Sequence, residues 1–484
     1  MSFPDLALRL DAAAPLPLAL QLARLLAQEI RDGHLASGEA MPSSRALAEA
    51  LHLSRHVAMS ALRELELEGW VESRPGSGTY VSVVPPDQLA PTWGTPAESP
   101  GMPETPAFEL SSQLRPVSTL AATLLDLSDG FPDARLAPKE ALAKGYRRAL
   151  QRHGNDLLGR GEPRGNPLLR EQLALHLRES RGLKIRAENL LVTRGIPMAL
   201  TLIASALQGD AAVENPGQPL AWEALRAAGC RLHPVAADAQ GLIPEALEAL
   251  LSRQAIAFLH LSPRRHFPTT VPLAAARRQH VMALAAQHSF AVVEDDPDAE
   301  LSWANPVPLP LAAEDPAGRV IHLGSLSQIL ASGLGLGYLV APSALVDRLA
   351  RVRQRLDLQG DHVLEWAVAD LIRDGDLERH LARARKIYRE RRDTFAEMAQ
   401  KCLGMDFEIT VPESGLALWV QTPRRLDLEK WATACLRAGI KMHPGRHFEF
   451  HGQPLNALRL GYGHLEAEDM QQALGVLTRE LRHG

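Results

Sequence analysis

The sequence predicts a multidomain protein, with a small, mostly helical N-terminal domain and a large α/β domain that ends in a smaller α+β part. Three observations predict this arrangement. Two short amphipathic helical patterns precede a glycine-rich hairpin, a proline-rich stretch follows, and the remainder alternates short apolar runs with helical patterns. We expect an N-terminal domain at residues 1–82, a linker at 83–122 and a large domain at 123–484. The large domain is expected to divide into parts at about 150–345 and about 346–484.

Composition and charge narrow the class of protein. The 484 residues are 46% apolar and 23% charged, which is typical of a globular protein with a substantial core. The first residues lack the apolar run of a signal peptide, and no run approaches the ~20 apolar residues of a membrane span, so we expect a cytoplasmic protein. We expect no disulfide framework and no metal site, because the cysteines are few and far apart (Cys230, Cys402 and Cys435). With a net charge of −5, any nucleic acid must be recognised by a local surface.

Two short helices joined by a tight turn are predicted in the N-terminal domain. An amphipathic helix is expected from Leu16 to about Asp32. Ser43 or Ser44 can then cap a short helix, and Ser54 can cap a second one after the turn at His52 and Leu53. This is the helix-turn-helix pattern, in which the start of the second helix enters the major groove of DNA.

A β-hairpin is predicted after the second helix, with Trp70–Ser73 pairing with Thr79–Ser82 around a glycine-rich turn. From the helix-turn-helix geometry, the outward candidates for contacts in the major groove are Ser54, Arg55, His56 and Ser60.

The N-terminal domain resembles the GntR family of winged-helix regulators. The resemblance is carried by PSSR at 42–45, LSR at 53–55, LExEGW at 65–70 and SRPGSGTYV at 73–81. It implies that Arg45 and Arg55 contact DNA and that the hairpin is a wing whose Gly78 and Thr79 lie near the minor groove. The other candidate DNA-binding residues are Ser43, Ser44, Arg74, Gly76 and Ser77. Members often carry Asn-Thr and an arginine where this chain has His56, Val57 and Ser60. We expect weak binding by one domain and useful affinity from a dimer on two half-sites; a helical module that binds only protein is the alternative.

Short apolar runs after residue 122 predict parallel strands that are buried on both faces of a sheet. The runs are NLLVT (189–193), AIAFLHL (255–261), FAVVEDD (290–296) and RVIHLG (319–324).

From Leu125 onward the chain resembles the fold type I aminotransferases, and the fusion to a GntR head is similar to the MocR subfamily of regulators. The resemblance is carried by LSDGFPD (127–133), GRGEPRGNPLLRE (159–171), VTRG (192–195), VENPG (213–217), SPRRHFPTT (262–270), VEDDPDAEL (293–301), GSLSQILASGLGLGYLVAP (324–342) and LRLGY (458–462).

This resemblance implies a site for pyridoxal phosphate (PLP), which needs a lysine for the Schiff base, a carboxylate at the pyridine nitrogen and donors for the phosphate. The lysine position holds Gln328, and glutamine cannot form an imine. The position of the phosphate-binding arginine holds Gly335. Two aromatic positions hold Pro297 and Gln218. The sequence therefore predicts that the fold is kept and the catalytic apparatus is lost.

Other positions of the expected cofactor site are retained or gained. Ser325 and Ser327 could donate to a phosphate, as could Arg194 beside Gly195, and Asp295 could hold the pyridine nitrogen. Arg459 could bind the carboxylate of a substrate or effector. Structural roles are the alternatives: Asp295 capping a turn, Arg459 in an ion pair, and Gln328 filling the volume of lysine.

We therefore expect no covalent PLP, and non-covalent PLP stays open. The expected function is a DNA-binding transcriptional regulator whose large domain dimerises and senses an effector, an amino acid or a carboxylate, without transamination. The expected partners are a double-stranded DNA operator and a second copy of the chain. The alternatives are a PLP-dependent aminotransferase, a regulator that responds to PLP, and a scaffold whose large domain only dimerises.

Overall fold

The computed structural model describes residues 10–11, 16–74, 77–84, 86 and 124–483. The chain forms two compact units, Met1–Val117 and Ser118–Gly484, and each is described by itself. Most of the expected linker, residues 87–122, lies outside the described residues.

The described residues of the smaller unit form three helices and a two-stranded hairpin, in the order that the sequence predicts. Its elements are α2 (Leu18–Arg31), α3 (Ser44–Ala50), α4 (Arg55–Leu67), β1 (Val71–Arg74) and β2 (Gly78–Val81). The two strands pair antiparallel, with Val71 opposite Val81. The three helices and the hairpin enclose an apolar core of Leu22, Leu26, Leu47, Ala58, Leu65, Trp70, Val71 and Val81.

The larger unit is built on an eight-stranded sheet with the order β4-β11-β10-β9-β8-β5-β6-β7. Its strands are β4 (Leu190–Thr193), β5 (Ala211–Asn215), β6 (Leu232–Asp238), β7 (Gly241–Leu242), β8 (Phe258–Leu261), β9 (Ala291–Asp295), β10 (Val320–Ser325) and β11 (Gly337–Val340). The four runs expected to be strands are β4, β8, β9 and β10. Two strands outside those four runs are antiparallel: β11 pairs antiparallel with both β10 and β4, and β7 pairs antiparallel with β6.

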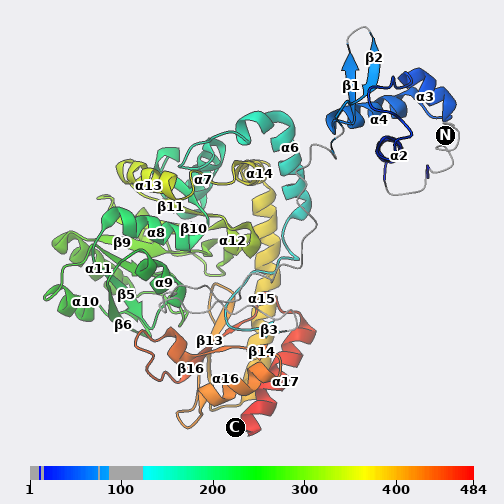
Figure 1. The fold of residues 1–484 in the computed structure, drawn as a ribbon. Helices are drawn as coiled ribbons and strands as arrows, with labels where there is room; N and C mark the ends of the chain where they lie inside the picture. Colours follow the sequence, from blue (N-terminus) through cyan, green and yellow to red (C-terminus); the bar gives the residue numbers. More distant parts are fainter. Residues whose placement is uncertain (1–9, 12–15, 75–76, 85, 87–123, 484) are drawn as a thin grey trace, which may run out of the picture. The chain divides into compact units, whose positions relative to one another are not determined.

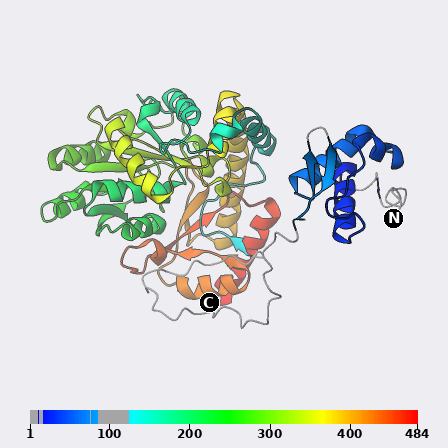
Figure 2. The ribbon, with the colours of Figure 1, turned by 45° about the horizontal axis from the view of Figure 1, so that its top comes forward.

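Helices cover both faces of this sheet, which explains why most of its strands are largely apolar and buried (Figures 1 and 2). One face packs against α8 (Ile196–Leu207), α9 (Pro219–Ala227) and α13 (Ser343–Leu356). The other packs against α7 (Pro167–Arg181), α10 (Pro244–Leu251), α11 (Ala275–His288), α12 (Leu326–Ile329) and α14 (His362–Arg373), with α6 (Lys139–Leu157) against α14. The division expected near residue 345 falls within α13, which contacts α8 and β4.

The C-terminal part holds a separate antiparallel sheet of β12 (Glu408–Thr410), β13 (Ala417–Gln421), β16 (Ala457–Gly461) and β15 (His443–Pro444). It is accompanied by α15 (Asp376–Leu403), α16 (Leu428–Arg437) and α17 (Ala467–His483). Figure 1 shows α15, in gold, running from α14 towards α17. The short strand β3 (Leu125–Asp126) pairs with β14 (Ile440–Lys441), which fixes the start of the larger unit to its C-terminal part.

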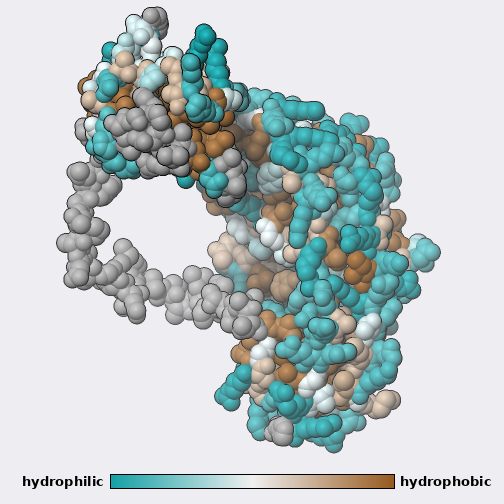
Figure 3. All heavy atoms as spheres, turned by 90° about the vertical axis from the view of Figure 1, so that its right-hand side faces the viewer, coloured by the Kyte–Doolittle hydropathy of each residue, from teal (hydrophilic) through white to brown (hydrophobic). Residues whose placement is uncertain are grey.

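Single-turn 3₁₀ helices complete the larger unit: η1 (Ala187–Asn189), η2 (Ala299–Leu301), η3 (Leu311–Ala313), η4 (Ser332–Leu334) and η5 (Gly445–Phe448). Hydrophilic side chains cover much of the face of this unit that Figure 3 presents. Among the described residues, no helix combines the length and apolar character needed to cross a bilayer.

Candidate functional site

Two serines fix the helix-turn-helix geometry of the smaller unit. The Ser43 hydroxyl accepts a hydrogen bond from the backbone N–H of Ala46 at 3.2 Å, and the Ser54 hydroxyl accepts one from Val57 at 3.3 Å. Of the two serines expected to cap the first helix, it is therefore Ser43 that does so, and Ser44 is its first residue. These caps set where α3 and α4 begin and hence which side chains face outward.

The first two turns of α4 present basic side chains and one exposed large apolar side chain, Met59. Arg55 and His56 are exposed, as predicted, whereas Ser60 is half-buried. The neighbouring Met59 is instead 51% exposed. On α3, Arg45 is exposed, and neither Arg45 nor Arg55 has a hydrogen-bond or ion-pair partner among the described residues. Both guanidinium groups are therefore available to a phosphate or a base.

The wing presents a further basic side chain, Arg74, beside the turn. The guanidinium carbon of Arg74 lies 4.5 Å from the ring centre of Tyr80, and its Nε donates to Glu72 at 3.2 Å. Ser77 and Gly78 are exposed and Thr79 is half-buried. Gly76 lies outside the described residues. Since Arg74 is engaged by Glu72, the helix arginines are better placed than Arg74 to neutralise phosphates.

In the larger unit, Gln328 occupies the lysine position and is bonded to the protein itself. Its side-chain amide donates a hydrogen bond of 2.6 Å to the backbone carbonyl of Gly130. The Ser325 hydroxyl accepts from the backbone N–H of Gln328 at 3.1 Å, which makes it the cap of α12. The Ser327 hydroxyl accepts from Leu336 N–H at 2.6 Å and donates to its carbonyl at 3.1 Å. All three side chains thus bond to backbone.

The expected phosphate side of the site is open and lacks a converging arginine. Arg194 has a side chain that is 64% exposed, with Nε 3.4 Å from the carboxylate of Asp357. Gly195 has a φ of +80°, a left-handed conformation at the start of α8, and Gly335 has a φ of +56°. A glycine at position 335 supplies no guanidinium. Among these residues, the cation that an anion could bind is the exposed Arg194, which already lies beside the carboxylate of Asp357.

Asp295 ends β9 and is buried, at 4% exposed. The Nε2 atom of the buried His260 lies 3.5 Å from Asp295 Oδ2. Neither His260 Nε2 nor Asp295 Oδ1 has a hydrogen-bond partner among the described residues. Asp295 borders a cavity of about 20 Å³ that is lined by Gln218, Ser262, Arg264, Arg265, Phe267, Asp295, Asp296, Pro297 and Asp298. We refer to it as the Asp295 cavity. Its volume is that of about one ordered water molecule, whereas small-molecule sites enclose roughly 300–1,000 Å³.

An ion-pair network that the sequence reading missed lies along the Asp295 cavity. Arg264 donates to Asp296 at 2.6 Å and to Asp298 at 2.7 Å. Arg181 also pairs with Asp296, and Arg265 with Asp298, both at 2.7 Å. All five side chains are nearly or fully buried. The adjacent arginines of SPRRHFPTT and the acidic run VEDDPD were the available signal, because buried charges occur almost only in pairs.

The charges of this network govern the ionisation of its carboxylates. Burial alone would raise the pKa of Asp296, but the positive charges of Arg264 and Arg181 outweigh it and hold that pKa at about 2.

Glu214 lies outside the network and is ionised differently. It accepts a hydrogen bond from the backbone N–H of Ser262 at 2.8 Å, and burial raises its pKa to about 8. The network is therefore ionised at neutral pH, while Glu214 is mainly protonated.

Arg459, the expected carboxylate ligand, is 2% exposed and already has protein partners. Its Nη1 donates to the carbonyl of Pro268 at 3.1 Å, and its Nε lies 3.4 Å from the carboxylate of Asp129. Its guanidinium carbon lies 4.4 Å from the ring centre of Phe267. Burial lowers its pKa to about 10, so it stays charged at neutral pH. Arg459 thus forms an ion pair within the protein, which is the structural role considered for it as an alternative to binding a carboxylate ligand.

The residues of this site do not suit PLP. Position 328 has no amine, position 335 has no guanidinium, and the space beside Asp295 holds about one water. Four polar atoms around that space have no hydrogen-bond partner among the described residues: Gln218 Oε1, Arg264 Nη1, Arg265 Nη1 and Asp295 Oδ1. Two donors and two acceptors are what one buried water can satisfy.

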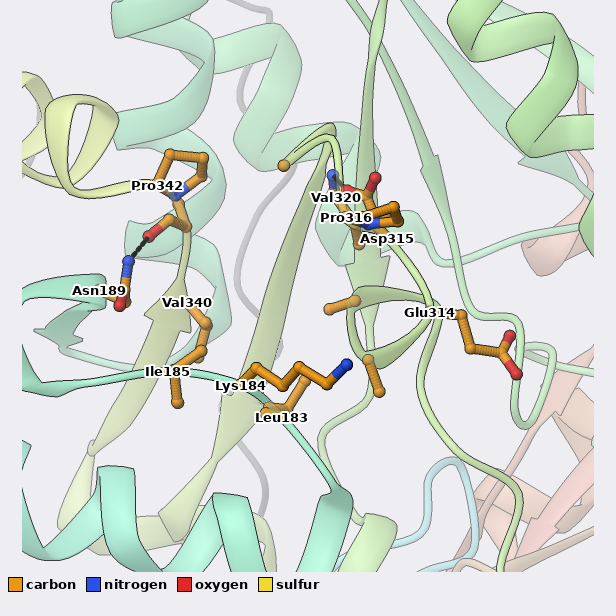
Figure 4. A pocket seen from close by; sticks show the side chains of 14 residues that line it. Leu183, Lys184, Ile185, Asn189, Glu314, Asp315, Pro316, Val320, Val340 and Pro342 are labelled. Carbon is orange, nitrogen blue, oxygen red and sulfur yellow. Dashed lines mark hydrogen bonds between the residues drawn. The ribbon is translucent and has the colours of Figure 1, made fainter.

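A larger cavity of about 520 Å³ lies elsewhere on the unit (Figure 4). It is lined by residues 183–185, 189, 312–316, 318, 320 and 340–342. The side-chain amide of Asn189 crosses one side to the carbonyl of Ala341 at 3.1 Å. None of the predicted site residues lines it. It opens where β10 begins, whereas ligands of such sheets bind at the carboxyl ends of the parallel strands.

Comparisons with known proteins agree with this two-part organisation. Residues 122–477 match the family model described as aminotransferase class I and II, and residues 18–81 match that of the gntR family of bacterial regulatory proteins. The probable rhizopine catabolism regulatory protein MocR of Rhizobium meliloti is 29% identical over 97% of this chain and 94% of its own length. The HTH-type transcriptional regulator TauR of Rhodobacter capsulatus is 28% identical, with 96% of each chain covered. The crystal structure of LysN, the α-aminoadipate aminotransferase of Thermus thermophilus, superposes with a TM-score of 0.69 at 28% identity, covering 75% of this chain and 93% of LysN.

Proposed function

Because this chain belongs to the aminotransferase class I and II family and carries a gntR-type regulatory domain, we propose that it is a DNA-binding transcriptional regulator whose larger domain does not catalyse transamination. The observation that carries the non-catalytic part is Gln328. An amide cannot form a Schiff base, and this one is bonded to the Gly130 carbonyl. The names of the relatives MocR and TauR support the regulatory part.

The DNA contacts in this proposal come from α3, α4 and the wing. Arg45 and Arg55 bind phosphates or base edges, His56 faces the groove beside them, and the exposed Ser77 and Gly78 of the wing lie against the backbone or minor groove. The acting form is a homodimer in the cytoplasm that reads two half-sites about 10 base pairs apart. Each arginine that neutralises a phosphate should contribute about one unit to the salt dependence of the affinity.

The larger domain senses an effector in this proposal. Arg459 stays charged and is shielded from water, so a carboxylate or amino acid that displaced Asp129 would gain a strong paired interaction. An effector of this kind shifts the affinity for DNA only if it binds the two states of the regulator differently. PLP is not the effector proposed, because the Asp295 cavity has room for about one water.

A PLP-dependent aminotransferase, or a regulator that responds to PLP, is the second candidate function, favoured by the superposition on LysN and by the retained Asp295. The two candidates separate in a transamination assay with added PLP and several amino donors. Turnover would overturn the proposal; the expected result is none.

Gel-shift titration of the full chain tests the DNA-binding part, using a duplex from its own promoter region at low and at physiological salt. The variants Arg45→Ala and Arg55→Ala should each weaken binding and lower the salt dependence by about one unit. The matched control is Arg24→Ala, an exposed arginine on α2 without a partner among the described residues. No shift of any duplex at low salt, or equal losses in all three variants, would contradict the proposal.

A further inference from the structure

The recognition helix α4 carries an exposed apolar side chain between two exposed arginines. Met59 is 51% exposed, although Ala58 and Ala61 on either side are fully buried. Arg55 lies one turn before it and Arg63 one turn after it, both exposed. Neither arginine has a partner among the described residues. The side chains that flank Met59 are therefore two free cations.

We infer that Met59 determines operator specificity by contacting the 5-methyl group of a thymine in the major groove. This inference rests on the proposed DNA-binding function. The thymine methyl is the one apolar group that base pairs display in the major groove, and apolar side chains recognise it. Methionine is long and unbranched enough to reach a base edge and adapt to it. Arg55 and Arg63 would bind DNA phosphates beside the helix. These contacts would fix how deeply Met59 enters the major groove.

The position of Met59 along α4 suits this role. In a helix-turn-helix domain the N-terminal part of the second helix contacts base edges, and Met59 is the fifth residue of α4. The half-buried Ser60, predicted from the sequence to face DNA, lies closer to the buried side. An apolar protein partner would bury the two unpaired guanidinium groups at a cost, whereas a polyanionic groove neutralises both.

Leu67 provides a matched control on the same helix. It is 74% exposed and lies eight residues further along, about 12 Å from Met59 by the helical rise. It belongs to the last turn, which the docking geometry keeps away from base edges. Both side chains are exposed, so replacing either by alanine leaves the core of the smaller unit intact.

The test begins by selecting duplexes from a randomised library with the full chain, and then replaces each thymine of the selected site by deoxyuridine, which lacks only the methyl group. Replacing one particular thymine of each half-site should weaken the binding of wild type about four-fold. This is the effect of losing one methyl group that binding would otherwise remove from water. Met59→Ala should bind the thymine and uridine duplexes equally, Met59→Leu should keep the discrimination, and Leu67→Ala should match wild type.

The outcomes separate this inference from the function on which it rests. Wild type that is insensitive to uridine at every position, or Met59→Ala that keeps the sensitivity, would overturn the role of Met59 and leave DNA binding standing. Failure of the wild-type chain to enrich any duplex would overturn the proposed function and the inference together. Circular dichroism of each variant confirms that the helices are formed.

Discussion

The side-chain nitrogen of Gln328 lies 2.6 Å from the backbone oxygen of Gly130, and this hydrogen bond joins two segments that are 198 residues apart. Gln328 belongs to α12 at the end of β10, and Gly130 follows β3, whose partner β14 lies in the C-terminal part. The position that holds a lysine in the catalytic relatives' motif thus makes a structural contact here. Gln328 still provides a hydrogen-bond donor at this position, but it lacks the amine that forms a Schiff base.

Replacing Gln328 by alanine should lower the free energy of unfolding of the larger domain by about 1 kcal/mol, because the Gly130 carbonyl loses its side-chain donor. Urea unfolding followed by fluorescence measures this. The control is Gln279→Ala on α11, an exposed glutamine without a partner among the described residues, which should stay within about 0.5 kcal/mol of wild type. Equal stabilities of the two variants would show that the hydrogen bond contributes nothing.

Restoring the lysine alone should not restore a cofactor. In Gln328→Lys the amine is present, but Gly335 still supplies no phosphate ligand and the Asp295 cavity still has room for about one water. We expect no covalent PLP adduct at residue 328 after borohydride reduction, as measured by intact mass and peptide mapping. A stoichiometric adduct would mean that the site opens readily and that Gln328 was the single barrier.

The sequence predicted what depends on local pattern and left out what depends on long-range contacts. Serine caps at Ser43 and Ser54 and the apolar runs of four strands are local signals, and the structure has both. The antiparallel insertion of β11 cannot be read from its own residues, because an apolar run does not encode strand direction.

At the site, sequence reasoning identified the residues that were lost and missed the contacts that replaced them. The bond from Gln328 to Gly130 and the pairing of Arg264 with Asp298 join distant segments, and no spacing rule links them. The exposure of Met59 rather than Ser60 depends on the helix phase, which the Ser54 cap sets.

The buried ion-pair network should be intolerant of losing one member. Arg264→Met leaves Asp296 and Asp298 each short of a buried partner, and we expect a loss of roughly 3 kcal/mol or more. Arg425→Met removes the exposed pair with Asp406 and should cost less than about 1 kcal/mol. Both are measured by urea unfolding. A loss for Arg264→Met as small as that for Arg425→Met would contradict the network's role.

Glu214 should make the larger domain less stable as pH rises. Burial raises its pKa in the folded protein to about 8, above the roughly 4.3 of an unfolded glutamate. The folded state therefore binds the proton more tightly, and stability present below about pH 4 is lost progressively as pH rises to 8. At about 1.4 kcal/mol per pKa unit, this amounts to a few kcal/mol.

The variant Glu214→Gln isolates this effect, since glutamine mimics the protonated acid and can accept from Ser262 N–H. Melting temperatures of wild type and variant should agree near pH 5 and diverge towards pH 8.5, with the variant higher. Parallel profiles across this range would mean that Glu214 ionises normally in the folded protein.

Titration of the purified full chain with PLP, followed by absorbance spectra before and after borohydride and by thermal shift, measures whether the larger domain still binds the cofactor. We expect no absorbance band of a protein-bound Schiff base, no covalent mass increase and no rise in melting temperature, because residue 328 is a glutamine and the Asp295 cavity has room for about one water. A band that borohydride fixes to the protein would contradict this expectation, since an amine elsewhere in the chain would then hold the cofactor.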